Sequence, residues 1–360
     1  MKNEQVKRMA ASRLACALLA ASAAAVASAA VHVPKDYPGV RVEKDHRYGP
    51  RRGLPTEGFA YAAPVTRTNE WGYAGNGHAT GQDYDLYYPA ERRGALPVLV
   101  YIHGGAWCWP YDKTDHEEFF ELIANDGWAV FAPDYILQTD LFNRPGDPVR
   151  KEATIGGQLR DIDLFMGEVE RVARARGFDL SRLVIAGESA GGHLCSLYAY
   201  DAVTPSRLGL ALRHPLKIGL VFNLVGAVDF TDPNWEATMT PALGNSSERY
   251  RGFMSAMFGC RCDADSARRF SPVPLIAPGV PEHLLSYSCR AGKSDDGCIP
   301  VSNYDRLTNA LARCRVPYSG RLFAGTSHCE TMQPPAKEAR AWYLAELRRF
   351  REGRAPAGER

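Results

Sequence analysis

The sequence predicts an α/β fold built on a doubly wound, mostly parallel sheet, with an insertion that forms a cap. Two observations predict it. From about residue 83 onward, short apolar runs of strand length alternate with longer segments that carry apolar residues at helical spacing. The runs at 98–102, 128–132 and 183–186 are apolar throughout, as expected for parallel strands that are covered on both faces. In such sheets the functional groups gather at the carboxyl ends of the strands.

The elements follow in order along the chain. Residues 83–88 alternate in polarity, which is typical of an edge strand. Buried strands are expected at 98–102, 128–132, 183–186, 218–224, 284–288 and 318–323. Helices are expected at 117–125, 159–176, from 193 onward, 303–314 and 338–350. Residues 226–282 are rich in Pro and Gly and are expected to form the cap.

Residues 1–29 have the pattern of a secretory signal. A basic start precedes an alanine-rich apolar run at 14–26, and Ala27-Ser28-Ala29 fits a signal peptidase site. The run is shorter than the about 20 apolar residues that span a bilayer. We therefore expect export to the periplasm or beyond, with cleavage after Ala29 and no stable membrane span. An irregular segment at 30–80, a main domain at 81–352 and a tail at 353–360 would follow.

The charge balance gives little reason to expect a polyanionic partner. The net charge falls from +2 to −1 without residues 1–29, which hold four basic residues and one acidic residue. Neither value suggests binding to nucleic acid or to an anionic membrane surface.

Eight of the nine cysteines lie beyond the signal, an even number that permits disulfides in an exported protein. We expect disulfides among the later cysteines and no metal, because Cys260-Arg261-Cys262 lacks the second pair that a zinc site needs. Cys195 is expected to be a buried free thiol. No cofactor is expected.

A G-x-S-x-G motif stands where a strand passes into a helix. Gly187-Glu188-Ser189-Ala190-Gly191 follows the apolar run 183–186 and precedes the helix that begins near His193. This is the pattern of a nucleophile elbow, which lifts the serine hydroxyl above the sheet edge. The helix then directs its N-terminal N–H groups toward that hydroxyl. The motif predicts that Ser189 attacks a carbonyl carbon.

A second motif, His103-Gly104-Gly105-Ala106-Trp107, comes directly after the strand that ends at residue 102. Its two glycines let the backbone approach a ligand closely and turn N–H groups toward it. We expect an oxyanion hole formed by the backbone N–H groups of Gly105, Ala106 and Ala190. We expect His103 to be a buried histidine that holds the loop.

The expected base is His328, in the loop Gly325-Thr326-Ser327-His328 after the last strand. Serine, acid and histidine then follow the chain order of a hydrolase triad. The acid is expected to be Asp296, in the loop between Gly292 and Pro300, with the adjacent Asp295 as the alternative. Asp229, after the preceding strand, is an outside candidate.

Together these motifs resemble the α/β-hydrolase esterases and lipases, most closely the hormone-sensitive-lipase-like and bacterial feruloyl-esterase-like branches. The resemblance covers roughly residues 80–350. It implies Ser189 as nucleophile, His328 as base and an acyl-enzyme intermediate. The chain departs from the first branch at Ala106, where a third glycine is usual, and at Glu188, where an aspartate is usual. Ala106 keeps its N–H, so the expected oxyanion role is unaffected.

The expected function is that of an exported serine carboxylesterase acting on a small-molecule or carbohydrate ester. An amide-cleaving hydrolase is the first alternative, because arylformamidases share the His-Gly-Gly-x-Trp pattern. A non-catalytic binding protein on a hydrolase fold is the second, although such proteins commonly lose the serine or the histidine. Trp107, Trp109 and Tyr135 would either line an acyl pocket or pack in the core.

Overall fold

The computed structural model describes residues 31–49, 82–91, 94–109, 111–138, 153–205, 207–356 and 358–359. Ten strands of this part form one sheet in the order β1-β2-β3-β5-β4-β6-β7-β8-β9-β10. Strands β4 to β10 run parallel, whereas β1, β2 and β3 are antiparallel to their neighbours. The bounds are β1 Val31–His32, β2 Val40–Arg47, β3 Asp83–Pro89, β4 Pro97–Ile102, β5 Ala129–Pro133, β6 Asp179–Glu188, β7 Leu220–Leu224, β8 Glu282–Cys289, β9 Tyr318–Ala324 and β10 Gly358–Glu359.

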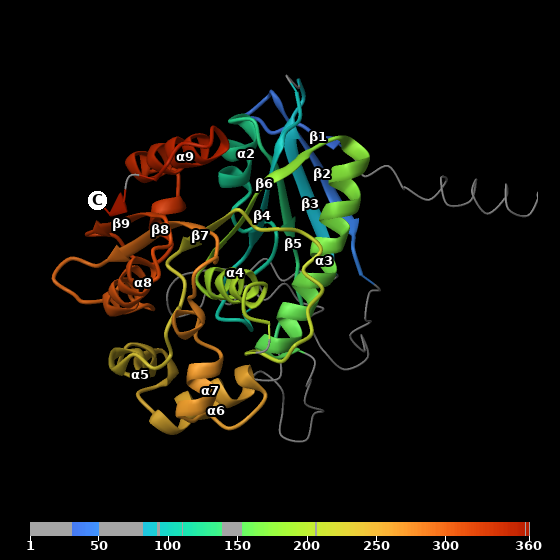
Figure 1. Ribbon diagram of the computed structural model, residues 1–360. Coiled ribbons are helices and arrows are strands. Elements are labelled where there is room, and N and C mark those ends of the chain that lie inside the picture. The colour runs from blue at the N-terminus through green and yellow to red at the C-terminus, as the bar shows by residue number, and fades with distance from the viewer. Residues whose placement is uncertain are drawn as a thin grey trace, which may run out of the picture.

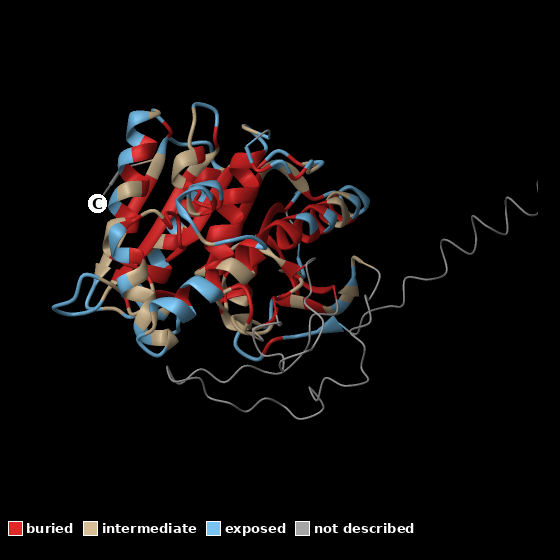
Figure 2. Cartoon of the chain, turned by 90° about the horizontal axis from the view of Figure 1, so that it is seen from below, coloured by how far each residue is buried: buried red, intermediate tan, exposed pale blue. Residues whose placement is uncertain are grey.

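Helices cover both faces of the sheet, which confirms the doubly wound class (Figure 1). Helices α2 (Glu117–Asn125) and α9 (Lys337–Arg351) pack on one face, where Phe120 and Tyr343 belong to the same apolar cluster. Helices α3 (Ile155–Arg176), α4 (Ala190–Asp201) and α8 (Val301–Arg313) cover the other face. Every residue of α4 is buried, and buried residues fill the centre of the molecule (Figure 2).

Three α-helices lie between β7 and β8, within residues 226–282, the segment that was expected to form a cap and is called the cap below. They are α5 (Pro233–Met239), α6 (Ser247–Phe258) and α7 (Ala264–Arg269), and they lie together at the lower edge of Figure 1. Aromatic side chains hold this region together. The rings of Phe230 and Trp235 are 5.2 Å apart, and those of Phe258 and Phe270 are 5.0 Å apart.

Strand β3 is not the edge strand that its alternating pattern predicted. β2 pairs with it on the outer side, and β5 on the inner side. The polar residue Asp85 is completely buried, and its carboxylate accepts a hydrogen bond from the backbone N–H of Asp45. The pattern misled because a buried carboxylate with partners has the same sequence signature as a solvent-facing one. Residues 40–47, expected to be irregular, form β2 instead. The predicted signal at 1–29, and residues 30 and 50–80 of the segment expected to be irregular, lie outside the described residues.

The expectation of disulfides was wrong for the described cysteines, all eight of which are free thiols. Cys195 is buried, as expected. The later cysteines are spread over separate parts of the fold, from the cap at Cys260 to the end of β8 at Cys289 and the end of α8 at Cys314. Within the described ranges, none of the helices has the length and apolar character needed to cross a membrane.

Candidate active site

Ser189 occupies a strained turn between β6 and α4, with φ 53° and ψ −119°. Strain of this kind in a residue other than glycine is frequent at functional sites. Glycine is required at nearby positions on both sides of Ser189, because a side chain there would clash with the backbone. A Cβ atom on Gly191 would lie 2.0 Å from the carbonyl oxygen of Ile102, and one on Gly187 would lie 2.6 Å from the same oxygen. The turn therefore presses against the end of β4, where the glycine loop begins.

A cavity of about 510 Å³ opens above Ser189. All the residues predicted from the sequence as triad or oxyanion groups line it, namely Gly105, Ala106, Ser189, Ala190, Asp296 and His328. Trp107 and Trp109 also line it. Tyr135 is a core residue instead, and its hydroxyl donates to the carbonyl oxygens of His103 and Gly104. The cavity thus lies at the carboxyl ends of the parallel strands, where this fold places its ligands.

Asp296 and His328 are brought together by two hydrogen bonds. Oδ2 of the aspartate lies 2.7 Å from Nδ1 of the histidine, and the backbone N–H of His328 donates to the Asp296 carbonyl at 3.0 Å. The other carboxylate oxygen accepts the N–H groups of Cys298 and Ile299. Burial alone would lower the pKa of His328, but the charge of Asp296 and its hydrogen bond outweigh burial and raise it.

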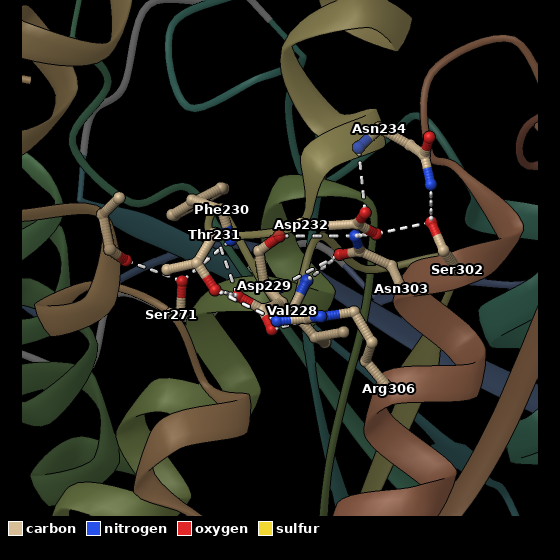
Figure 3. Close-up of polar contacts among 11 residues, drawn as sticks. Val228, Asp229, Phe230, Thr231, Asp232, Asn234, Ser271, Ser302, Asn303 and Arg306 are labelled. Atoms are coloured by element: carbon tan, nitrogen blue, oxygen red, sulfur yellow. Dashed lines mark hydrogen bonds and ion pairs between the residues drawn. The ribbon is translucent and has the colours of Figure 1, made fainter. Parts of the chain in front are cut away.

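The competing aspartates have other partners. Asp295 accepts hydrogen bonds from the guanidinium of Arg290 at 2.5 Å and from the N–H of Gly297 at 2.9 Å. Asp229 is bound by Arg306 at 2.6 Å and by the Thr231 hydroxyl, in a network that ties the start of the cap to α8 (Figure 3). Of the three candidates, Asp296 is the one whose carboxylate meets His328.

The glycine loop leaves backbone donors at the cavity. Gly104 donates its N–H to Oε1 of Glu188 at 2.6 Å. No residue within the described ranges accepts a hydrogen bond from the N–H of Gly105, Ala106 or Ala190. Gly105 and Ala106 have φ values of 92° and 46°, and the carbonyl of Gly105 accepts from the residues that close the loop. Three free N–H groups beside Ser189 suit an oxyanion.

Two buried histidines hold this loop. His103, 2% exposed, lies with Nδ1 3.0 Å from the Gly104 carbonyl and stacks on Tyr135, and burial lowers its pKa. His193 is one that the sequence analysis did not single out. It accepts from Trp107 Nε1 at 3.1 Å and donates to the Phe270 carbonyl at 2.8 Å. Burial lowers its pKa to about 4, so it stays neutral and joins the loop to the cap.

Glu188 and His116 were also missed as a pair. Glu188 is buried directly before Ser189, and His116 lines the cavity 3.4 Å from its carboxylate. The position of Glu188 inside the G-x-S-x-G motif could have marked this glutamate as part of the site. Nothing in the sequence marked His116, which lies 72 residues away along the chain.

One group among the described residues has the donor set of a metal site. Asp296, Cys298 and His328 each offer a ligand atom, and these atoms lie within 4.8 Å of one another. Asp296 and His328 already hydrogen-bond to each other, so a metal bound there would compete with that contact.

The parallel sheet, the strained serine between strand and helix, and the histidine–aspartate pair after the last strands define an α/β-hydrolase. Residues 84–311 match the BD-FAE family model, and the chain belongs to that family of α/β-hydrolase esterases.

Solved structures and curated proteins resemble the chain more distantly. The crystal structure of esterase B from Lactobacillus Rhamnosis (HN001) superimposes on this chain with a TM-score of 0.63 and a sequence identity of 21%. The match covers 98% of this chain and 96% of that one, and it supports the fold. A probable isoprenylcysteine alpha-carbonyl methylesterase from Oryza sativa subsp. japonica is 26% identical over 73% of this chain and 58% of its own length. A kynurenine formamidase from Danio rerio is 22% identical over 48% of this chain and 54% of its own. The chain thus spans little more than half the length of these curated relatives.

Proposed function

We propose that the protein is a serine carboxylesterase that cleaves its substrate through an acyl-enzyme intermediate. One observation carries the proposal: the Asp296–His328 pair shares a cavity with Ser189 and with the unpartnered N–H groups of the glycine loop. This arrangement supplies a nucleophile, a base with an orienting acid, and donors for a developing oxyanion.

In the first half-reaction, Ser189 Oγ attacks the ester carbonyl while Nε2 of His328 takes its proton. Asp296 holds the opposite nitrogen and stabilises the imidazolium that forms. The N–H groups of Gly105, Ala106 and Ala190 bind the oxyanion, each such donor being worth about 3–4 kcal/mol of transition-state stabilisation. His328 then gives its proton to the leaving alcohol. In the second half-reaction it activates water, which releases the acid and restores the serine.

The proposed substrates are small esters or acyl groups on carbohydrates. The size of the cavity, about 510 Å³, suits a ligand of this kind, and its aromatic walls suit an apolar acyl or alcohol group. The plant relative is named for a methylester, which is compatible with a small alcohol.

Amide cleavage is the second candidate, because one relative is a kynurenine formamidase and the same groups can attack an amide carbonyl. A panel of esters and amides with identical acyl groups separates the two. We expect turnover of the esters by the wild type and none by Ser189→Ala. Faster cleavage of the matched amides would favour the alternative, and undiminished ester turnover by Ser189→Ala would remove Ser189 from the mechanism.

We further propose that the protein is exported and loses residues 1–29. The basic start, the short apolar run and the small residues at 27–29 support this. Mass spectrometry of protein from the cell envelope and medium should find a chain that begins at Ala30. A full-length chain in the cytoplasm would contradict the proposal.

A further inference from the structure

His116 is an imidazole in the cavity for which the proposed mechanism has no use. It lies at the N-cap position of α2, its side chain is 11% exposed, and it lines the same cavity as Ser189 and His328. A histidine that lines a cavity can either pack as part of its wall or hydrogen-bond to the ligand. The contacts of His116 distinguish these two roles.

Glu188 fixes one edge of the His116 ring. The carboxylate lies 3.4 Å from Nε2, and it also accepts the N–H of Gly104 at 2.6 Å and the hydroxyl of Tyr101 at 2.8 Å. Glu188 is 3% exposed. Burial alone would raise the pKa of Glu188, but the hydrogen bonds and the charge of His116 lower it, so it remains an anion.

The groups around His116 favour its protonated form. Burial would lower its pKa, but the hydrogen bond and the charge of Glu188 raise it. Burial raises the pKa of Asp115 to about 8, so that this carboxyl is largely neutral at pH 7. His103, at the end of β4, has a lowered pKa and adds no positive charge. The raised pKa favours the imidazolium form of His116, whose Nε2–H is directed to Glu188.

The other ring nitrogen, Nδ1, takes no part in the contact with Glu188. Within the part of the chain that the structure describes, no residue hydrogen-bonds to Nδ1 of His116. The ring is held edge-on by aromatic neighbours, with its centroid 6.0 Å from that of Tyr101 and 6.5 Å from that of Phe120. A fixed ring with one unused N–H at a cavity wall is a preorganised donor.

His116 lies near the segment that follows the proposed base. Tyr101 touches the His116 ring and also donates its hydroxyl to Sδ of Met332, in the short helix Glu330–Met332 just beyond His328. Gln333, the next residue, lines the cavity with His116. Since His328 must protonate the leaving alcohol, the alcohol part of an ester lies toward this segment.

We propose that His116 is a specificity-determining residue that donates its Nδ1–H to an acceptor oxygen on the alcohol part of the substrate. The protein then prefers esters whose alcohol carries such an oxygen over esters of plain alkyl alcohols. This inference rests on the proposed esterase function.

Two acetates of nearly equal size test it, namely 2-methoxyethyl acetate, which has the acceptor oxygen, and butyl acetate, which has a methylene in its place. The quantity measured is the ratio of their kcat/KM values. A hydrogen bond from a charged donor corresponds to about a tenfold or larger preference. In His116→Phe we expect the ratio to fall about tenfold, with kcat/KM for butyl acetate within about threefold of wild type.

A second readout needs no substitution. As the pH rises through the pKa of His116, Nδ1 loses its proton, because Nε2–H remains with Glu188. The wild-type ratio should then fall toward that of the variant. If His116→Phe does not fold because Glu188 is left unpaired, His116→Phe/Glu188→Gln removes the buried charge, and the same ratio is measured.

Two results would overturn the inference. The first is an unchanged ratio in the variants, which would show that Nδ1 does not contact the alcohol; if both kcat/KM values also fell equally, His116 would act only by holding the glycine loop through Glu188. The second is a wild-type ratio that does not change with pH. Failure of the wild type to cleave either ester, or any other ester, would instead contradict the proposed function itself, and this inference would fall with it.

Discussion

Oδ2 of Asp296 lies 2.7 Å from Nδ1 of His328, and Oδ1 of the same aspartate binds two backbone N–H groups of its own loop. The loop therefore holds the carboxylate in place independently of its hydrogen bond to the histidine. Asp295, one residue earlier, turns to Arg290 instead.

Asp296→Asn should lower kcat by about 10⁴, because an amide at this position supports the wrong histidine tautomer and does not stabilise the imidazolium. Asp295→Asn is the matched control and should retain kcat to within a few-fold, since its partner is Arg290. Steady-state kinetics on a p-nitrophenyl ester measure both. Equal losses in the two variants would show that the acid has been misassigned.

The pH profile should show an acid limb that belongs to His328. Only the neutral imidazole can take a proton from Ser189, and Asp296 raises the pKa of His328 above 6.5. We expect kcat/KM to fall as the pH drops through that raised value, with a midpoint above 6.5. In Asp296→Asn the midpoint should move to lower pH. A wild-type profile that stays flat down to pH 5 would contradict the assignment of the base.

Gly191→Ala should destabilise the fold, by about 1–3 kcal/mol or more. The new Cβ atom would meet the carbonyl oxygens of Ile102 and His103 at 2.0 and 2.6 Å, and these are backbone atoms that cannot move aside. Gly252→Ala, in the middle of α6, meets nothing within 4 Å and should stabilise the protein by about 1 kcal/mol. Urea denaturation compares them. A neutral Gly191→Ala would show that the elbow can relax.

The sequence could place the chemistry-bearing loops because each motif follows a predicted strand, and the strands before the glycine loop and before Ser189 are strongly apolar. β4 ends before the glycine loop, β6 before Ser189 and β9 before His328. The choice between Asp295 and Asp296 needed the structure, because adjacent residues in a turn point in different directions and no spacing rule separates them.

Other features could not be predicted because they depend on distant partners. The alternating pattern around Asp85 predicts a surface residue on an edge strand, but β2 pairs with this strand and Asp85 is buried. His116 is brought to Glu188 by the packing of α2 against β4, which no local pattern encodes. The prediction of disulfides was wrong for a similar reason, because pairing depends on which cysteine-bearing segments lie next to each other in the fold.

Soft metal ions should inhibit the protein. Zn²⁺ binds sulfur, nitrogen and carboxylate oxygen together, and Cys298 Sγ lies within 4.8 Å of ligand atoms of Asp296 and His328. Micromolar Zn²⁺ should reduce ester hydrolysis reversibly, with recovery on adding a chelator. Cys298→Ser should be less sensitive, whereas Cys260→Ser, at an exposed position in the cap, should match the wild type. Equal sensitivity of the Cys298 variant would place the inhibition elsewhere.

In the proposed mechanism, Ser189 is a nucleophile that His328 activates. A fluorophosphonate probe tests it most directly, because the probe forms a covalent bond only with an activated serine. Peptide mass spectrometry should find the label on Ser189 in the wild type, no label in Ser189→Ala and strongly reduced labelling in His328→Ala. A label on another residue, or none on wild-type protein that hydrolyses esters, would contradict the account.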